Sequence, residues 1–571
     1  MHGYTKSQLN DLSESLGLPV EPLHDLTELR PPLSPEQMRG IAEQARTLLS
    51  RFYVHAPTKR TLYAADPPAQ LTVLLDRLAT VEPGTREVER EQEFHRDMTE
   101  IFTSVRDRHT VYVLPDPFRR AVAFLPFVVE RCWEDREPTY LITKVHPAIA
   151  DDELPDPRGK DGPAVRVTHW NGVAMSRAVA LSGQVNAGGN PDARLARGLT
   201  RLTFRWMGLG SRPLEDWVTL RYVVGDGDPE ERKFSWLFTA RGPARPGRAP
   251  RPRPPQRAGT RGIDGEGEWI RGVQRNLFAG KDAAPLQYSP VGSDEEPYGY
   301  LRIHSFELAD GGLEGYLDLA AELIAGAPRE GLIVDIRGNP GGSIVAAERM
   351  LQMLSPEPVI PERLQFLSTP EAAAMARQYF AGLDAGDARP TPVEGFDRSR
   401  REAADAGAQY IVSPPVEVER PTGPGGCLHD GPKVLIVDAL TYSAGDIFAA
   451  GFQDQGLGEV IGTNSRTGVG GGNVWEYDFV RECAQSYLLD PLPRNASFDV
   501  AVRRATRVRA NSGMAIEDVG VSVDSDPDSR KLLVHHLTRR DVLHDNGALL
   551  EFALTRLRRL VDHLPTAPSG A

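Results

Sequence analysis

Apolar residues recur at helical spacing through the first part of the chain. Ile41 and Leu48 fall on one face of such a helix, and two later runs, at 71–78 and 98–105, keep the same spacing. Polar residues fill the positions between them, as expected for helices that bury one side. We therefore predict an N-terminal helical domain over residues 1–115.

Between residues 116 and 240 the pattern changes to short apolar runs separated by Gly, Asp and Pro. The runs that read as strands lie at 121–125, 140–143, 165–168 and 218–224. Their shortness and their spacing predict a small β-rich domain in this part of the chain.

Residues 241–262 follow as a linker. They contain seven Arg and no acidic residue, with a Pro- and Arg-rich tract at 250–255. Such a composition cannot bury a core and favours an extended, solvated backbone. The segment is either a plain spacer or a basic docking segment, and the sequence leaves both open.

From residue 263 to the end, apolar strands alternate with helices. The predicted strands are 298–306, 331–336 and 433–438, and the predicted helices are 313–324, 344–354, one that begins near Ser443, and 546–564. Near-continuous apolar strands between helices are typical of an α/β core with a largely parallel sheet. Residues 355–430, with one helix-like stretch at 370–383, interrupt the alternation and are predicted to be an insertion.

Composition narrows the class of protein. The chain has 571 residues, 40% of them hydrophobic and 25% charged, and no run approaches the roughly 18 apolar residues of a membrane helix. The net charge of −13 argues against a nucleic-acid binder. Three scattered cysteines give neither a disulfide framework nor a metal spacing, and the N-terminus lacks an apolar signal region. We expect a cytoplasmic protein with no membrane segment, no metal and no cofactor.

The first candidate site motif is Asp-Ile-Arg-Gly-Asn-Pro-Gly-Gly at residues 335–342, between a predicted strand and a predicted helix. Glycines in such a turn allow backbone N–H groups to face a ligand, and the helix N-terminus adds positive potential. The N–H of Gly341 is therefore a candidate oxyanion donor, although the motif alone is equally typical of a tight turn.

The second motif, Thr-Tyr-Ser-Ala-Gly-Asp at 441–446, puts Ser443 at the start of a helix. A hydroxyl at this position is either an N-cap or a nucleophile, in which case the N–H of Ala444 would stabilise an oxyanion. Two weaker candidates are His109, in Asp-Arg-His-Thr at 107–110, and Glu517, in Ile-Glu-Asp-Val-Gly-Val at 516–521. Taken singly, each of these two is more typical of a structural or surface residue.

Taken in order, these motifs and the glycine-rich stretch at 462–472 resemble one family, the C-terminal processing (tail-specific) and tricorn core serine proteases. The resemblance implies a crotonase/ClpP-like α/β catalytic core over residues 263–571. It also implies that an N-terminal helical domain and a PDZ-like domain, over 116–240, precede this core. Processing proteases of the family use a Ser–Lys dyad, with the Lys in a loop after the nucleophile.

Lysine is scarce in this chain, with eight Lys against 58 Arg. The loop at 467–472 contains none, the only later lysine is Lys531, and Lys433 lies at the far end of a strand from Ser443. A Ser–Lys dyad is therefore not expected. The tricorn-type arrangement of Ser, His and Glu remains, and by resemblance Ser443 is the nucleophile, His109 the base and Glu517 the residue that orients or polarises the triad.

Two further residues keep alternatives open. His304, on the predicted strand 298–306, is the rival base. Asp446 lies one helical turn after Ser443, where processing proteases often have Glu, and would help to bind a substrate terminus or cap the helix.

The sequence thus predicts a serine peptidase that cleaves peptides or unfolded and C-terminal protein segments through an acyl-enzyme on Ser443. By resemblance, the insertion 355–430 would gate the site and the chain would form a homo-oligomer. One alternative is a non-catalytic peptide or apolar-ligand binding protein on the same fold. Another is a crotonase-like acyl-CoA enzyme, against which the helical and PDZ-like segments argue.

Overall fold

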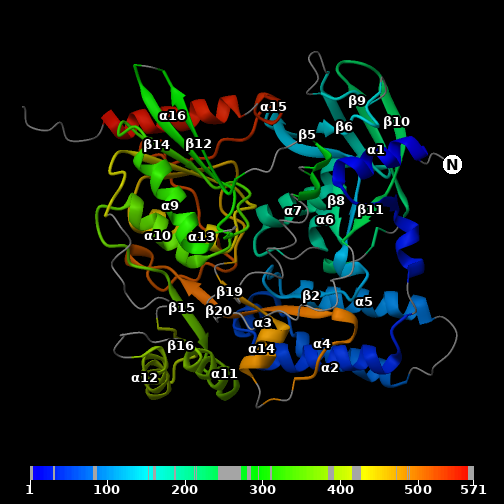
Figure 1. Ribbon diagram of the computed structural model, residues 1–571, viewed down its shortest axis with the longest axis vertical. Helices are drawn as coiled ribbons and strands as arrows, with labels where there is room; N and C mark the ends of the chain where they lie inside the picture. The colour runs from blue at the N-terminus through cyan, green and yellow to red at the C-terminus, as the bar shows by residue number, and fades with distance from the viewer. Residues whose placement is uncertain are drawn as a thin grey trace, which may run out of the picture.

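A computed structural model gives the arrangement of the chain (Figure 1). It describes residues 4–562 except 30–31, 81–86, 152–153, 158–162, 186–187, 211, 214, 242–271, 275, 279–283, 294, 309–310, 384–390, 415–425, 471, 485–486, 488 and 545. The Arg/Pro-rich linker predicted at 241–262 lies outside the described residues apart from its first position. The predicted domain boundaries stay predictions, but most of the predicted elements are found.

The N-terminal part is helical, as the apolar spacing predicts. Its helices are α1 (Lys6–Leu16), α2 (Pro35–Arg51), α3 (Ala56–Tyr63), α4 (Pro67–Ala79) and α5 (Glu87–Ser104). Helix α2 starts at Ser34, whose hydroxyl accepts from the Gln37 N–H while the Gln37 side chain accepts from the Ser34 N–H. The buried faces of α2, α4 and α5 form one core.

The middle of the chain contains strands at the four predicted places, and the structure arranges its strands in two antiparallel sheets. One has the order β10-β9-β6-β5-β4, with β7 beside β6, and the other the order β1-β11-β3-β8. Their strands are β1 (Val20–Pro22), β3 (Ala121–Phe124), β4 (Phe127–Glu134), β5 (Glu137–Val145), β6 (Val165–Trp170), β7 (Val173–Ala174), β8 (Phe204–Trp206), β9 (Trp217–Val224), β10 (Pro229–Ser235) and β11 (Leu237–Ala240). Helices α6 (Met175–Gln184) and α7 (Pro191–Thr203) pack against each other beside them. Because β1 pairs with β11, the N-terminal segment joins the β-rich part.

The C-terminal part contains the predicted α/β core. Its sheet has the order β12-β13-β14-β17-β18, antiparallel between the first two strands and parallel thereafter. The strands are β12 (Leu286–Gly292), β13 (Pro297–Ile303), β14 (Leu332–Asp335), β17 (Lys433–Val437) and β18 (Glu459–Gly462). Helices α9 (Gly312–Ala325), α10 (Ile344–Leu354) and α13 (Ala444–Asp454) cover one face, and α16 (Gly547–Asp562), preceded by α15 (Arg539–Leu543), covers the other. Helices cover both faces of the sheet, and its strands are therefore apolar on both sides. On β14, Val334 faces the first group of helices and Ile333 faces α16.

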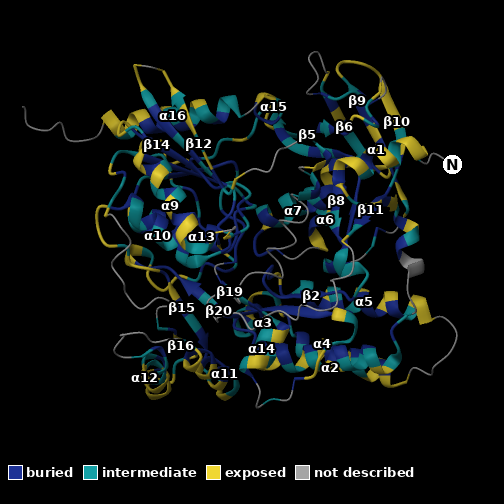
Figure 2. Cartoon of the chain, viewed as in Figure 1, coloured by how far each residue is buried: buried dark blue, intermediate teal, exposed yellow. Residues whose placement is uncertain are grey.

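The fourth sheet connects the predicted insertion to the N-terminal helices. Its order is β16-β15-β20-β19, and β2 also pairs with β20. The elements are β2 (Val111–Val113), β15 (Arg363–Leu367), α11 (Pro370–Ala381), α12 (Pro392–Asp405), β16 (Tyr410–Val412), β19 (Gly472–Glu476), α14 (Tyr477–Cys483) and β20 (Ser497–Thr506). Figure 2 shows that β20 is buried along its length, between these helices and the N-terminal ones. The described parts of the segment 355–430 therefore belong to a core that they share with α2 and α5.

None of the helices within the described ranges combines the length and the apolar character that crossing a membrane requires. The molecule as a whole is a mixed α/β structure in which segments from both chain ends meet around β20.

Candidate active site

Ser443 lies in a sharp turn between strand β17 and helix α13. Its backbone adopts φ 56° and ψ −121°, a left-handed conformation that costs a non-glycine residue on the order of 1–3 kcal/mol. The hydroxyl makes no N-cap hydrogen bond to the helix that it precedes. The N-cap interpretation of Ser443 is therefore wrong, and the strained turn leaves the hydroxyl available for chemistry.

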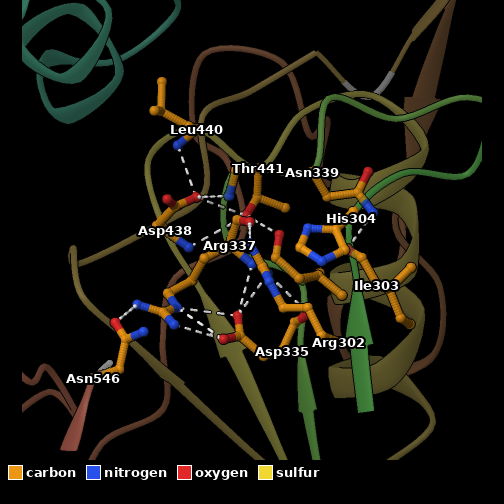
Figure 3. A network of polar contacts seen from close by, with 12 residues as sticks. Arg302, Ile303, His304, Asp335, Arg337, Asn339, Asp438, Leu440, Thr441 and Asn546 are labelled. Atoms are coloured by element: carbon orange, nitrogen blue, oxygen red, sulfur yellow. Dashed lines mark hydrogen bonds and ion pairs between the residues drawn. The ribbon is translucent and has the colours of Figure 1, made fainter. Parts of the chain in front are cut away.

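A polar network holds this turn against the glycine-rich turn that follows β14 (Figure 3). Asp438 Oδ1 accepts hydrogen bonds from the Gly338 N–H at 2.8 Å and from the Leu440 N–H at 3.0 Å. The Thr441 hydroxyl lies 3.1 Å from the same oxygen and 3.1 Å from the Ile336 carbonyl oxygen. The two turns that the sequence singles out are thus fastened together at the carboxyl edge of the sheet.

Gly341 lies directly against Ser443. A Cβ built on Gly341, whose φ is 110°, would lie 2.5 Å from Ser443 Cβ and 2.9 Å from the Ala444 nitrogen, so a side chain is excluded here. The Gly341 N–H, however, already donates to Asn339 Oδ1 at 2.8 Å, because the Asn-Pro-Gly turn closes on itself. The Ala444 N–H has no protein acceptor among the described residues. Of the two expected oxyanion donors, only Ala444 is uncommitted in this structure.

His109 lies in a rigid turn after α5. Asp107 Oδ1 accepts from the His109 N–H at 2.8 Å, and Asp107 Oδ2 accepts from the Thr110 hydroxyl, also at 2.8 Å. Thr110 in turn accepts from the Ala501 N–H of β20 at 3.2 Å. The Asp-x-His-Thr motif is therefore a turn that fixes the backbone of His109 and anchors it on a buried strand.

The loop 467–470 connects His109 to the turn of Ser443. The Gly468 N–H donates to the Thr441 carbonyl oxygen at 2.8 Å, which fixes the loop to the turn that precedes Ser443. At its other end, a Cβ on Gly470 would lie 1.9 Å from Cε1 of His109, so the ring lies against the Cα of this glycine. The structure therefore brings His109 to the loop beside Ser443, although no hydrogen bond joins these two side chains among the described residues.

Glu517 completes the group. Its turn packs on the same loop, since Val521 N–H donates to the Thr467 hydroxyl at 2.8 Å and Thr467 N–H donates to the Val521 carbonyl oxygen at 3.0 Å. A ring nitrogen of His109 and one carboxylate oxygen each of Asp107 and Glu517 all lie within 4.8 Å of one another, and all three residues are buried. The ammonium of Lys59 binds this group, with Nζ 2.7 Å from Glu517 Oε1.

Burial dominates the electrostatics of these residues. It lowers the pKa of the His109 ring to about 4, although Asp107 opposes the shift, so the ring is neutral at pH 7 and able to accept a proton. Nδ1 of His109 is buried and has no hydrogen-bond partner within the part of the chain that the structure describes. Burial also raises the pKa of the Glu517 carboxyl, and the Lys59 charge opposes that shift.

Asp446 is fully buried, which does not fit the expectation that it binds a substrate terminus. Helix α13 turns this residue toward the loop 467–470, where Oδ1 accepts weakly from the Val469 N–H at 3.4 Å. Burial raises the pKa of its carboxyl to about 7, while nearby hydrogen-bond donors, the Ser443 backbone N–H among them, lower it. Asp446 therefore contacts the loop 467–470 from the protein interior.

The rival base, His304, follows β13 and lies next to the turn after β14, where Asn339 Nδ2 donates to the Ile303 carbonyl oxygen (Figure 3). Its Nε2 is 2.9 Å from Gln287 Oε1, and its ring lines a cavity of about 810 Å³ together with Arg302 and Arg337. Ser443 is not among the residues that line this cavity. The geometry thus groups His109, and not His304, with the loop beside Ser443.

Sequence reasoning missed Lys59 altogether. It considered only lysines near Ser443, and those are indeed remote: Lys433 Nζ donates to the His429 and Gly431 carbonyl oxygens at the start of β17, and Lys531 is exposed. Lys59 lies on α3, far from every motif in the sequence. Its only signal was that lysine is rare in this chain.

The sequence was then compared with known proteins. Residues 297–524 match the sequence model of Peptidase family S41. The matched segment contains Ser443, Gly341 and Glu517, whereas His109 precedes it. No curated protein sequence matches the chain.

Comparison with solved structures gives matches over almost the whole chain. Mature CPAF matches with a TM-score of 0.62 and 16% identity over 93% of this chain and 99% of that chain. Mature CPAF complexed with lactacystin gives a TM-score of 0.61 and 16% identity over 92% and 98%. The tricorn protease gives a TM-score of 0.36 and 15% identity over 94% of this chain and 38% of that chain. The similarity to CPAF shows that the chain shares its overall fold.

Proposed function

We propose that this chain, whose residues 297–524 match Peptidase family S41, is a serine peptidase in which Ser443, His109 and Glu517 perform the reaction through an acyl-enzyme. The observation that carries the proposal is the convergence of three distant segments. The turn of Ser443, the turn of His109 and the turn of Glu517 all contact the one loop at 467–470.

The chemistry follows from the protonation states. Neutral His109 accepts the proton of the Ser443 hydroxyl as Oγ attacks the scissile carbonyl carbon. The Ala444 N–H stabilises the oxyanion that forms, and the Gly341 N–H joins it when Asn339 releases it. His109 then gives the proton to the leaving amine, and water hydrolyses the Ser443 ester by the reverse use of the same base. Glu517 stabilises the positive charge on the ring.

The reaction requires a rearrangement that opens the site. Ser443 and His109 are only 7% and 2% exposed. The segment before α7 covers the loop 467–470, because Asn190 Nδ2 donates to the Thr467 carbonyl oxygen at 2.8 Å and Gly189 packs on Val469. Displacement of this cover by a peptide would expose the hydroxyl and let it turn to His109.

The substrate class and the finer architecture are part of the same proposal. The family acts on peptide or protein substrates, and we assign to this chain peptides and unfolded or C-terminal protein segments. Residues 116–240 act as a PDZ-like domain and the C-terminal part as a crotonase/ClpP-like core, in a cytoplasmic homo-oligomer. The fold similarity to CPAF and the two antiparallel middle sheets support this layout.

The direct test is peptide hydrolysis by Ser443→Ala. Unfolded casein and a library of short peptides are incubated with wild type and variant, and circular dichroism verifies that both are folded. We expect hydrolysis by wild type and none above background by the variant. Undiminished hydrolysis by a folded Ser443→Ala protein would contradict the proposal and would favour the reading of the fold as a non-catalytic binding protein.

A further inference from the structure

Lys59 is a fully buried lysine in the middle of the candidate site. Its side chain comes from α3 in the N-terminal helical part and reaches the turn at 516–520, more than 450 residues later in the chain. Nζ lies 2.7 Å from Glu517 Oε1 and 2.5 Å from Asp518 Oδ1, and 3.5 Å from the Arg106 carbonyl oxygen. A buried lysine with two carboxylate partners is rare unless the charge is needed.

The charged and titratable groups around Lys59 come from three elements. The turn of Glu517 contributes two carboxylates, and the turn after α5 contributes Asp107. His55, the residue just before helix α3, has a pKa that burial lowers to about 3, so this ring is neutral. Tyr63 donates its hydroxyl to Asp518 Oδ1 at 2.9 Å. Lys59 is therefore the cation of a cluster of three carboxylates.

Lys59 is not itself a base for Ser443. The three carboxylates raise the pKa of its ammonium against the opposing effect of burial, so the side chain stays charged and has no lone pair to accept a proton. No hydrogen bond between Lys59 and Ser443 exists within the described part of the chain. The Ser–Lys mechanism of the processing proteases is thus not recovered by a lysine from another segment.

We propose that Lys59 is a positioning residue of the peptidase, which holds Glu517 in place beside His109 through the contact at 2.7 Å and opposes its protonation. Glu517 would otherwise be a buried carboxylate with no counter-charge, and such a group takes up a proton. A protonated Glu517 no longer stabilises the imidazolium that forms when His109 takes the proton of Ser443. The inference rests on the proposed function. It also makes the N-terminal helical part necessary for catalysis, because α3 supplies the charge.

The test measures the rate of fluorophosphonate labelling of the full chain against pH, for wild type, Lys59→Met and Lys59→Arg. We expect Lys59→Met to lower the labelling rate at pH 7 by about tenfold or more and to move the acidic midpoint upward by about one unit, since one pKa unit is a tenfold change in ionisation. Lys59→Arg keeps the charge and should restore both within about threefold. Lys433→Met, which removes another buried lysine outside the site, should leave the midpoint unchanged.

A double-mutant cycle separates this role from a general packing role. If Lys59 acts through Glu517, Lys59→Met should change the labelling rate by less than about twofold once Glu517→Gln is present. Lys59→Met leaves carboxylates unpaired and could fail to fold for that reason. In that case the double variant Lys59→Met/Asp518→Asn, which lacks one of those negative charges, takes the place of Lys59→Met in the same measurements.

The outcomes distinguish the two proposals. If the fluorophosphonate reagent does not label the wild-type protein, the proposed function is wrong, and this inference is wrong with it. If the wild-type protein is labelled but Lys59→Met keeps the wild-type midpoint, only the role of Lys59 is overturned. The same conclusion follows if the effects of Lys59→Met and Glu517→Gln simply add.

Discussion

The ring of His109 lies against the Cα of Gly470, so closely that a Cβ on Gly470 would be 1.9 Å from Cε1 and 2.3 Å from Nδ1 of the ring. Gly470 also has φ 132°, a conformation that L side chains rarely adopt. The contact joins the N-terminal turn of His109 to the loop that is fastened on the turn of Ser443. It is therefore a point at which two of the proposed catalytic segments meet.

We expect Gly470→Ala to displace the His109 ring and to lower kcat/KM for peptide hydrolysis by about 100-fold, since a displacement of 1 Å from the reacting geometry has effects of that size. Gly513→Ala is the matched control, because Gly513 has φ 87° but nothing within 4 Å of its Cβ position. The control should retain activity within about twofold. Equal losses in the two variants would mean that backbone strain, and not the contact with His109, causes the defect.

His109→Ala and His304→Ala should behave differently. Removing a general base lowers the rate by about 100-fold or more, so His109→Ala should lose nearly all hydrolysis of a peptide substrate. His304 bonds Gln287 outside this group, and its replacement should leave kcat/KM within about threefold of wild type. A steady-state assay of both variants at pH 7 decides the assignment, and the reverse ranking would reassign the base to His304.

Because the backbone at Ser443 is strained, we expect the substitution Ser443→Gly to stabilise the protein. Ser443→Gly relieves the φ of 56° and should raise the free energy of unfolding by about 1 kcal/mol, while it abolishes activity. Ser443→Ala keeps a Cβ and hence the strain, so it should show no such gain. Urea denaturation of the three proteins measures the effect, and equal stabilities of the glycine and alanine variants would argue against a strained turn.

Asp446 should make stability fall as pH rises. Burial raises the pKa of its carboxyl in the folded protein to about 7, from an ordinary value near 3.8. Between these two values the folded state holds a proton that the unfolded state has lost, so this group's contribution to stability declines from about pH 4 to about pH 7. Asp446→Asn should therefore be more stable than wild type at pH 8, by about 1 kcal/mol or more, and equal to it near pH 4. Thermal unfolding at the two pH values is the measurement, and a constant difference across this range would contradict the cause.

Much of the catalytic core was predictable because its elements have simple patterns. Helix Ile344–Leu354 has the predicted bounds, since a serine cap precedes it and apolar residues recur along one face. Ser443 and Gly341 were likewise visible as turn motifs between a strand and a helix.

Strand β20 was not predictable from its pattern. It is buried on both faces, yet it carries Asp499 and Arg503. The Arg503 guanidinium lies over the Phe366 ring at 5.4 Å and the Tyr379 ring at 5.3 Å, contacts that only the folded chain creates. A charged residue in a buried strand interrupts the apolar run by which strands are recognised.

The role of Lys59 was not predictable either, because it depends on contacts between segments far apart in the chain. It neighbours Arg60 on α3, and the two basic residues look alike in the sequence, although Lys59 is buried and Arg60 is exposed. Which of them faces the interior depends on the packing of α3 against the turn of Glu517, more than 450 residues away in the chain. Long-range packing of this kind leaves no local signal.

The most direct test of the account is to locate the fluorophosphonate adduct. The full chain is labelled at pH 7, its intact mass is measured, and tandem mass spectrometry identifies the modified residue in wild type, Ser443→Ala and His109→Ala. We expect one adduct in wild type, on Ser443, and none in either variant. An adduct on another serine, or unchanged labelling of Ser443 in the His109→Ala protein, would contradict the assignment of nucleophile and base.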